Sequence, residues 1–262
     1  MKELRVVISG GGTGGHIFPA VSIANAIREL RPDAQILFVG AQGRMEMQRV
    51  PQAGYEIKGL PIRGFFRPLW KPANIGVALD YLKSKHMAKQ ILREFQPQVA
   101  VGVGGYASSA ALGAANSLGI PTLIQEQNSY AGLANKNLAA KACKICVAYD
   151  GMERFFPADK IMMTGNPVRQ QLLDSKMTRE EALKAFDLSP DKKTVLLELG
   201  VGFNTPTIIR FPFEKLVREH ENITLIRLSR SKAMVPAGLG DRAVGINADM
   251  AQSIEDIAAK LR

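Results

Sequence analysis

The chain has 262 residues, a formal net charge of +10 and a sequence pI near 9.7. This length suffices for one large domain or two modest ones. No uninterrupted apolar run approaches the ~20 residues of a membrane-spanning helix, and Met1 leads almost directly into a predicted strand, so we expect neither a membrane span nor a signal peptide. The excess of cations favours an anionic partner: a nucleic acid, an anionic membrane or a phosphorylated substrate.

The segment SGGGTGGHIFP, from Ser9 to Pro19, is the most informative stretch of the chain. It lies between an apolar run at 4–8 and an amphipathic segment at 20–30, which predicts a strand, a glycine loop and a helix. Glycines let the backbone approach a ligand closely, and a helix N-terminus offers free N–H groups to an anion. The loop therefore predicts a diphosphate site with His16 as its ionisable group. A glycine turn that only packs a helix on a sheet is the alternative.

The glycine spacing alone does not select the ligand. Gly10, Gly12 and Gly15 satisfy the dinucleotide pattern G-x-G-x-x-G, but that pattern also needs an acidic residue at the end of the second strand. The predicted second strand at 35–40 is followed by no Asp or Glu before Glu46. A nicotinamide cofactor is therefore disfavoured. We expect Pro19 to occupy the first turn of the following helix, where its missing N–H costs nothing.

Large apolar side chains alternate with cations after residue 62. We expect Phe65, Phe66, Leu69 and Trp70 to contact an anionic membrane surface, because apolar side chains ringed by cations suit the headgroup boundary. Between 63 and 93 the only acid is Asp80, whereas the cations are Arg63, Arg67, Lys71, Lys83, Lys85, Lys89 and Arg93. Aromatic side chains that fold back onto the core are the alternative. Nucleic acid is disfavoured because no nucleic-acid-binding motif accompanies the basic stretch.

Three further segments follow predicted strands. Glycines and Tyr106 follow the strand at 97–103, with Ser108 or Ser109 as the expected helix cap. The polar run QEQNSY follows the strand at 122–124, and TGNPVR follows the last strand of this half. Ligands of open α/β sheets bind at the carboxyl ends of strands, so we expect these segments to converge on one crevice.

The two cysteines, Cys143 and Cys146, form an isolated C-x-x-C, and the three histidines are scattered along the chain. A structural zinc site needs further ligands nearby. We therefore expect no metal site, and two small thiols in the core.

The motifs GGGTGGHIFPA, GVGGYAS, QEQNSYAGLANK and TGNPVR together resemble the MurG-type family of bacterial cell-wall glycosyltransferases, over residues 4–195. The resemblance implies an α/β fold in which residues 1–170 form the Rossmann-like, acceptor-binding N-terminal domain of a GT-B enzyme. It implies an inverting hexosyltransferase of peptidoglycan synthesis. Such an enzyme transfers N-acetylglucosamine from UDP-N-acetylglucosamine to undecaprenyl-diphosphate-linked N-acetylmuramoyl-pentapeptide, without a cofactor or metal. It also implies a peripheral location at the cytoplasmic face of the membrane.

The same resemblance assigns roles by position. His16 becomes the candidate general base, because imidazole titrates near neutral pH; a helix-cap hydrogen bond without proton transfer is the alternative. The candidate substrate-binding residues are Thr13, Gly14, Gly15, Tyr106, Glu126, Asn128, Asn166 and Arg169.

The C-terminal part departs from this pattern. We expect a charged linker helix at 171–193, then a partial Rossmann-like domain at 194–262 with strands at 194–199, 223–228 and 243–246. The motifs LELGVGFNTPTIIRFPFE and DMAQSIEDIAAKL resemble the C-terminal part of a sirtuin-type NAD-dependent deacylase. The glycosyltransferase family's Gly-Gly-Ser-x-Gly-Ala donor loop has no counterpart in this part of the sequence. A catalytically inactive lipid-diphosphate-binding module, and less plausibly an NAD-site protein, are therefore alternatives. The oligomeric state is left open.

Overall fold

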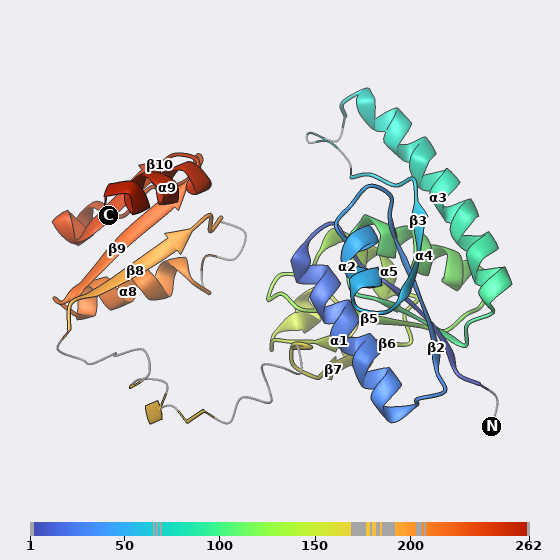
Figure 1. The fold of residues 1–262 in the computed structure, drawn as a ribbon. Coiled ribbons are helices and arrows are strands. Elements are labelled where there is room, and N and C mark those ends of the chain that lie inside the picture. Colours follow the sequence, from blue (N-terminus) through green and yellow to red (C-terminus); the bar gives the residue numbers. More distant parts are fainter. Residues whose placement is uncertain are drawn as a thin grey trace. The chain divides into compact units, whose positions relative to one another are not determined.

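The computed structural model describes residues 3–64, 66, 68, 70–168, 177–178, 180–181, 184, 192–202, 206 and 208–260. The chain divides into two compact units, Met1–Ser175 and Lys176–Arg262 (Figure 1). Most of the predicted linker helix at 171–193 lies outside the described residues. Within it, Thr178 and Glu181 exchange hydrogen bonds between side chain and backbone N–H at 2.7 and 3.1 Å, the pattern that caps a helix start.

The N-terminal unit is built on a seven-stranded parallel sheet in the order β3-β2-β1-β4-β5-β6-β7. This confirms the predicted Rossmann-like sheet. The chain reverses its direction of strand addition between β1 and β4, which creates a crevice at their carboxyl ends. The strands are β1 (Arg5–Ser9), β2 (Gln35–Ala41), β3 (Glu56–Leu60), β4 (Val99–Gly102), β5 (Thr122–Glu126), β6 (Lys144–Val147) and β7 (Ile161–Met163).

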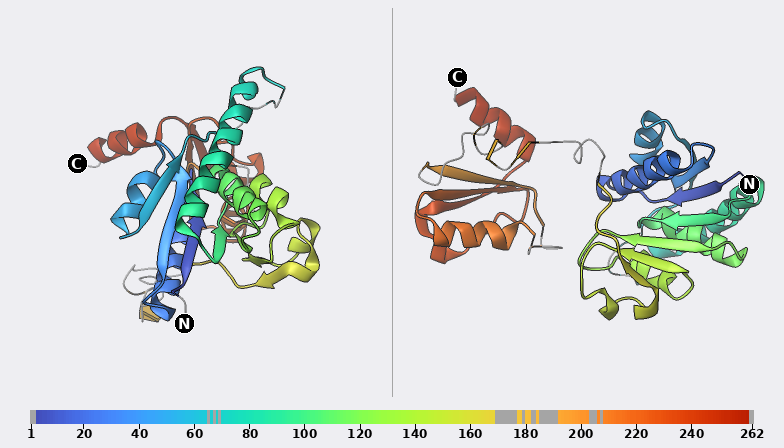
Figure 2. Two further views of the ribbon diagram at one scale, coloured as in Figure 1. Left: turned by 90° about the vertical axis from the view of Figure 1, so that its right-hand side faces the viewer. Right: turned by 90° about the horizontal axis from the view of Figure 1, so that it is seen from below.

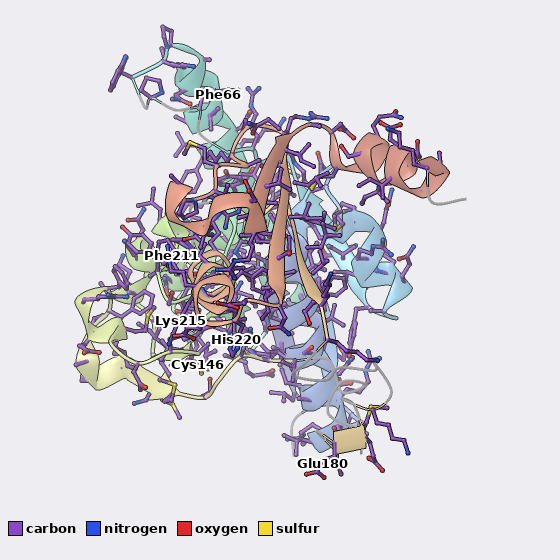
Figure 3. All side chains as sticks on the ribbon, turned by 90° about the vertical axis from the view of Figure 1, so that its left-hand side faces the viewer. Phe66, Cys146, Glu180, Phe211, Lys215 and His220 are labelled. Carbon is purple, nitrogen blue, oxygen red and sulfur yellow. The ribbon has the colours of Figure 1, made fainter. Side chains whose placement is uncertain are left out.

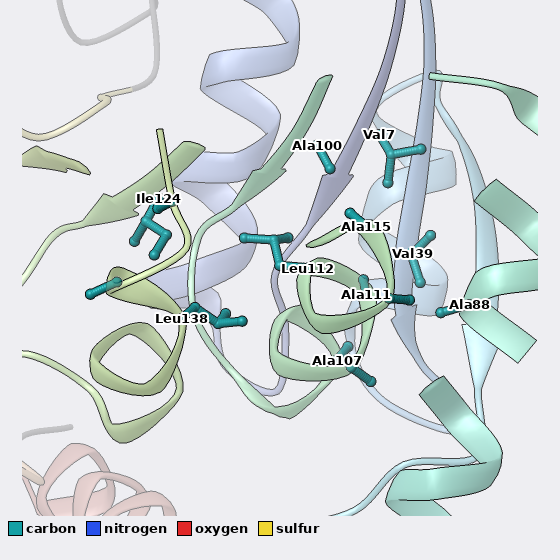
Figure 4. Packing of buried hydrophobic residues seen from close by; sticks show 14 of the residues in the cluster. Val7, Val39, Ala88, Ala100, Ala107, Ala111, Leu112, Ala115, Ile124 and Leu138 are labelled. Atoms are coloured by element: carbon teal, nitrogen blue, oxygen red, sulfur yellow. The ribbon is translucent and has the colours of Figure 1, made fainter. Parts of the chain in front are cut away.

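Buried side chains form a separate core layer on each face of this sheet. One layer packs Ile17, Ala20 and Ala24 of α1 against Val6 and Phe38. The other packs the alanine-rich α4 and parts of α3 and α5 against the opposite face (Figure 4). The small alanine side chains let α4 lie close to the strands. The helices are α1 (Gly14–Leu30), α2 (Glu46–Gln52), α3 (Ala73–Phe95), α4 (Tyr106–Ser117) and α5 (Leu133–Ala139).

Two predicted helix starts were wrong. Helix α1 begins at Gly14, so Pro19 lies inside the helix rather than in a first turn that begins near residue 19. Helix α4 begins at Tyr106 with Gly105 as its N-cap residue, and no side chain caps it. Ser108 is fully buried within the helix. In α4 the N-cap residue is a glycine with φ +89°, a backbone conformation that a serine rarely adopts, whereas α1 begins after Thr13, whose backbone is extended.

The second unit is a smaller α/β unit, as predicted. Its three strands are parallel in the order β10-β9-β8, with α8 and α9 on opposite sides of the sheet (Figure 2). Inside it, Glu198 accepts hydrogen bonds from Arg210 at 3.2 Å and Arg227 at 2.8 Å. Pairing offsets the cost of burying these charges. The elements are β8 (Thr194–Leu199), α8 (Arg210–Glu219), β9 (Ile223–Ser229), β10 (Ala243–Asn247) and α9 (Met250–Lys260).

Candidate functional site

The first glycine loop holds His16 through contacts at its Nδ1 atom. Gly12 has φ +85°, and Thr13 is the N-cap residue of α1, which places His16 in the first helical turn. The Nδ1 atom of His16 lies 3.0 Å from the carbonyl oxygen of Gly11 and 3.2 Å from the Thr13 hydroxyl. A carbonyl oxygen can only accept a hydrogen bond, so this contact favours the Nδ1–H tautomer, in which Nε2 keeps its lone pair. The half-buried imidazole is therefore set to accept a proton at Nε2.

The second glycine loop packs directly on the first. Gly104 and Gly105, which follow β4, have φ of +99° and +89°. A Cβ atom on Gly105 would lie 2.5 Å from the Gly11 carbonyl oxygen, and one on Gly104 would lie 2.9 Å from His16 Nε2. The predicted convergence of the two loops is thus present in the structure. It brings the N-termini of α1 and α4 to the same edge of the sheet, where both helix dipoles favour an anion.

Gln127, which the sequence analysis did not single out, joins three of these segments. Because Pro19 has no N–H, the carbonyl oxygen of Gly15 lacks the donor that a regular helix would supply. The Nε2 atom of Gln127 lies 2.9 Å from that oxygen and 3.2 Å from the carbonyl oxygen of Val103. The position of a proline four residues after a glycine in this helix was the available signal.

Glu126 is buried and organises the loop after β5. One carboxylate oxygen accepts from the backbone and side-chain N–H groups of Asn128 at 3.1 and 3.0 Å. The other accepts from Gly132 N at 2.9 Å and from the Asn135 side chain at 3.0 Å. With both oxygens engaged by four donors, Glu126 is suited to hold the loop and the Asn128 amide in place rather than to exchange protons.

Tyr106 stands at the N-terminus of α4 and is half exposed. Its ring covers Gly64, where an added Cβ atom would come within 2.2 Å of the ring. Gly64 belongs to the connection from β3 to α3, so Tyr106 ties that connection to the second glycine loop. Of the other candidate site residues, Thr13 and Gly15 are exposed on the first loop and Gly14 is half-buried there.

Asn166 does not join the two glycine loops. It lines an apolar groove of about 480 Å³ on the α1 face of the sheet, together with Ile23, Ile27, Val101 and Cys146. No residue of either glycine loop lines that groove among the described residues. The final candidate, Arg169, lies outside the described residues.

The cysteines differ from the expected pair of core thiols. Cys143 is exposed and only Cys146 is partly buried. Burial raises the pKa of the Cys146 thiol, and a hydrogen bond with Thr164 acts weakly in the opposite direction. Within the part of the chain that the structure describes, no three His, Cys, Asp or Glu side chains gather as metal ligands would.

An exposed apolar surface surrounds the start of α3. Trp70 is 84% exposed and Phe66 47%, and Figure 3 shows Phe66 on the loop that precedes the helix. Asn74 holds this loop through hydrogen bonds of 2.8 and 3.0 Å to the backbone of Phe66. Phe65 and Leu69 lie outside the described residues. We define the α3 surface as Phe66, Trp70, Ile75, Leu79 and Leu82, all exposed.

The last three residues of the α3 surface were missed by the sequence analysis. Their spacing of i, i+4 and i+7 was the available signal, since it places them on one side of a helix. They are 62–69% exposed, which is unusual for three large apolar side chains on one side of a helix. Among the described residues, no helix has the length and hydropathy needed to cross a membrane.

The parallel sheet, the two glycine loops and the histidine in the first turn of α1 together define a Rossmann-like α/β domain with its candidate site at the carboxyl ends of the strands. The chain belongs to the family described as the glycosyltransferase family 28 N-terminal domain, whose model matches residues 6–147.

Similar proteins carry more specific descriptions. The chain is 68% identical over 206 residues to the UDP-N-acetylglucosamine–N-acetylmuramyl-(pentapeptide) pyrophosphoryl-undecaprenol N-acetylglucosamine transferase of Bacteroides fragilis, a match that covers 78% of this chain and 53% of the relative. The corresponding transferase of Bacteroides thetaiotaomicron is 68% identical over 200 residues, which cover 76% and 53%. The chain thus spans about half the length of the curated relatives it matches.

Among solved structures, MurG of Acinetobacter baumannii has a similar fold, with a TM-score of 0.56 and 22% identity over 95% of this chain and 68% of that one. A UDP-N-acetylglucosamine 2-epimerase assigned in Listeria monocytogenes gives the same TM-score at 15% identity, over 98% and 72%. At these identities the likeness concerns the fold alone.

Proposed function

We propose that this chain carries the acceptor-binding half of an N-acetylglucosaminyltransferase of cell-wall synthesis. The donor is UDP-N-acetylglucosamine and the acceptor is N-acetylmuramoyl-pentapeptide linked to undecaprenyl diphosphate. The carrying observation is the contact between the two glycine loops around His16, in a chain 68% identical over 206 residues to a transferase of that name.

In this proposal His16 acts as the general base. Its Nε2 lone pair takes the proton of the acceptor's sugar hydroxyl while the oxygen attacks the anomeric carbon of the donor. The bond from that carbon to the diphosphate breaks, its electron pair leaves with UDP, and the configuration inverts. The N-termini of α1 and α4 meet the charge that develops on the diphosphate, and no metal or cofactor is required.

The remaining candidates have supporting roles. Thr13, Gly14 and Gly15 face the substrates from the first loop, and Asn128, held by Glu126, supplies an amide to the sugar. Tyr106 lines the acceptor side. Arg169 and Asn166 are proposed as further contacts to the UDP-sugar.

We further propose that the α3 surface rests on an anionic membrane, where a polyprenyl-linked acceptor resides. Apolar side chains enter the headgroup boundary and nearby lysines and arginines attract anionic lipids. Replacing Trp70, Ile75 and Leu79 together by Ser should abolish co-sedimentation with phosphatidylglycerol vesicles. Leu30→Ser, at an 81% exposed site on α1, serves as the control. Equal binding of both variants would remove the membrane assignment.

The alternative is a catalytically inactive module that binds the lipid diphosphate. It is favoured by the C-terminal unit, whose sequence lacks the family's donor loop. Incubation of the chain with labelled UDP-N-acetylglucosamine and a lipid I analogue separates the two: formation of the disaccharide product supports the transferase. Retained binding of the lipid analogue without transfer supports the inactive module. A chain that neither transfers the sugar nor binds the lipid analogue would contradict both hypotheses.

The resemblance of residues 196–261 to the C-terminal part of a sirtuin-type deacylase stays a hypothesis. If the second unit holds an NAD site, NAD should bind the chain saturably in calorimetry. Absence of a binding heat at millimolar NAD would contradict the hypothesis of an NAD-site protein.

A further inference from the structure

A buried carboxylate lies directly beneath the first glycine loop. Glu46, the first residue of α2, is fully buried. Its Oε1 atom accepts a hydrogen bond from Ala41 N at 3.0 Å, and its Oε2 atom accepts one from Gly12 N at 3.0 Å. Glu46 therefore connects the end of β2 to the loop that carries His16.

The recess that holds this carboxylate exists because two of the residues around it, Gly11 and Gly40, are glycines and have no side chain. A Cβ atom on Gly11 would lie 2.1 Å from Glu46 Oε1, and one on Gly40 would lie 2.7 Å from its Cγ atom. No other residue type fits at either glycine without displacing Glu46 or the backbone. Gly11 in the loop and Gly40 in β2 thus make room for the Glu46 carboxylate.

The N–H of Gly12 and the C=O of Gly11 belong to one peptide group. On one side of that peptide the N–H donates to Glu46 Oε2, and on the other side the C=O accepts from His16 Nδ1 at 3.0 Å. A carboxylate, a peptide and an imidazole are therefore connected in series. A donor that binds a carboxylate polarises its peptide, which makes the carbonyl oxygen a stronger acceptor.

We propose that Glu46 is a positioning residue for His16. Acting through the Gly11–Gly12 peptide, it holds the imidazole in the Nδ1–H tautomer and leaves the Nε2 lone pair free. A carboxylate that contacts Nδ1–H directly has this effect in catalytic triads; here one peptide group stands between the two. The value of this tautomer for catalysis rests on the proposed function, but the tautomer itself is a property of the chain.

The test is the tautomer of His16 in the full chain, read from imidazole nitrogen shifts of ¹⁵N-histidine-labelled protein at alkaline pH. We expect the wild-type ring to be mainly Nδ1–H. In Glu46→Gln the side chain offers one acceptor oxygen to two N–H donors, so the share of Nε2–H should rise about three- to tenfold, the factor that one ordinary hydrogen bond represents. Glu46→Asp, which keeps the charge, should restore much of the wild-type ratio. Glu29→Gln, at an exposed site on α1, should leave it unchanged.

Three results would overturn the proposal. One is a wild-type His16 that is mainly Nε2–H, which requires no variant and so stands even if Glu46→Gln fails to fold. The second is a folded Glu46→Gln chain with the wild-type tautomer ratio, which would make Glu46 only a structural support of the loop. The third is a Glu46→Asp ratio equal to that of Glu46→Gln, since the effect would then not depend on the carboxylate. Because no transfer is measured, failure of the sugar-transfer proposal would appear separately, in the product assay.

Discussion

The contact between the two glycine loops predicts a large cost for one added methyl group at Gly105. Its backbone, at φ +89° and ψ 172°, lies in a region that is almost restricted to glycine, which costs an alanine about 1–3 kcal/mol. The new Cβ atom would also lie 2.5 Å from the Gly11 carbonyl oxygen. Neither atom belongs to a flexible side chain, so the loops must separate, and overpacking of this kind costs about 1–3 kcal/mol more. We therefore expect Gly105→Ala to lower the free energy of unfolding by about 2–6 kcal/mol.

Gly151→Ala is the matched control. Gly151 also has a positive φ, 74°, but no atom lies within 4 Å of the position of its Cβ. It should cost only about 1–2 kcal/mol, partly offset by the reduced entropy of the unfolded chain. Hydrogen exchange of amides in β1 and β4 against urea concentration reports on the N-terminal unit alone. Equal decreases in the free energy of unfolding for Gly105→Ala and Gly151→Ala would refute the contact between the two glycine loops.

Two further measurements address the loop after β5 and the thiols. Glu126→Gln replaces a carboxylate that accepts from four donors, so it should destabilise residues 127–135 by about 1–3 kcal/mol in local hydrogen exchange. Glu153→Gln, at an exposed site, is the control. Equal exchange rates of residues 127–135 in both variants would contradict the role of Glu126 in holding this loop. Iodoacetamide should label exposed Cys143 first at neutral pH, and labelling of Cys146 should rise as the pH increases, because burial raises the pKa of its thiol and only the thiolate reacts. Equal rates across the pH range would show that the thiols share one environment.

The order of strands, glycine loops and helices in the N-terminal unit follows from the sequence. Apolar runs between glycine-rich turns determine a parallel α/β sheet, because buried parallel strands require such runs and the turns must admit positive φ. The same reasoning located both glycine loops and His16. It also identified the polar run after β5, since strand ends in such sheets face the ligand crevice.

The sequence did not determine which polar groups turn inward. Glu126 was a candidate for substrate contact, yet four nearby donors engage its carboxylate. From the sequence, Glu46 was noted only because it follows the second strand too late to serve a dinucleotide site. In the structure it lies under the loop that carries His16. Asn166 follows a strand but lines the groove on the α1 face. These outcomes depend on which donors the folded backbone brings within 3 Å, and sequence spacing does not encode that distance.

Only the tertiary structure shows how the first glycine loop is held. Its order of strand, loop and helix is local, because it depends on residues that are neighbours in the chain. Its shape depends on Glu46 at the start of α2, on Gly105 after β4 and on Gln127 after β5. These groups meet because parallel strands align their carboxyl ends at one edge of the sheet. The sequence by itself therefore determined that a loop of this kind exists, and the packing of distant segments decided its shape around His16.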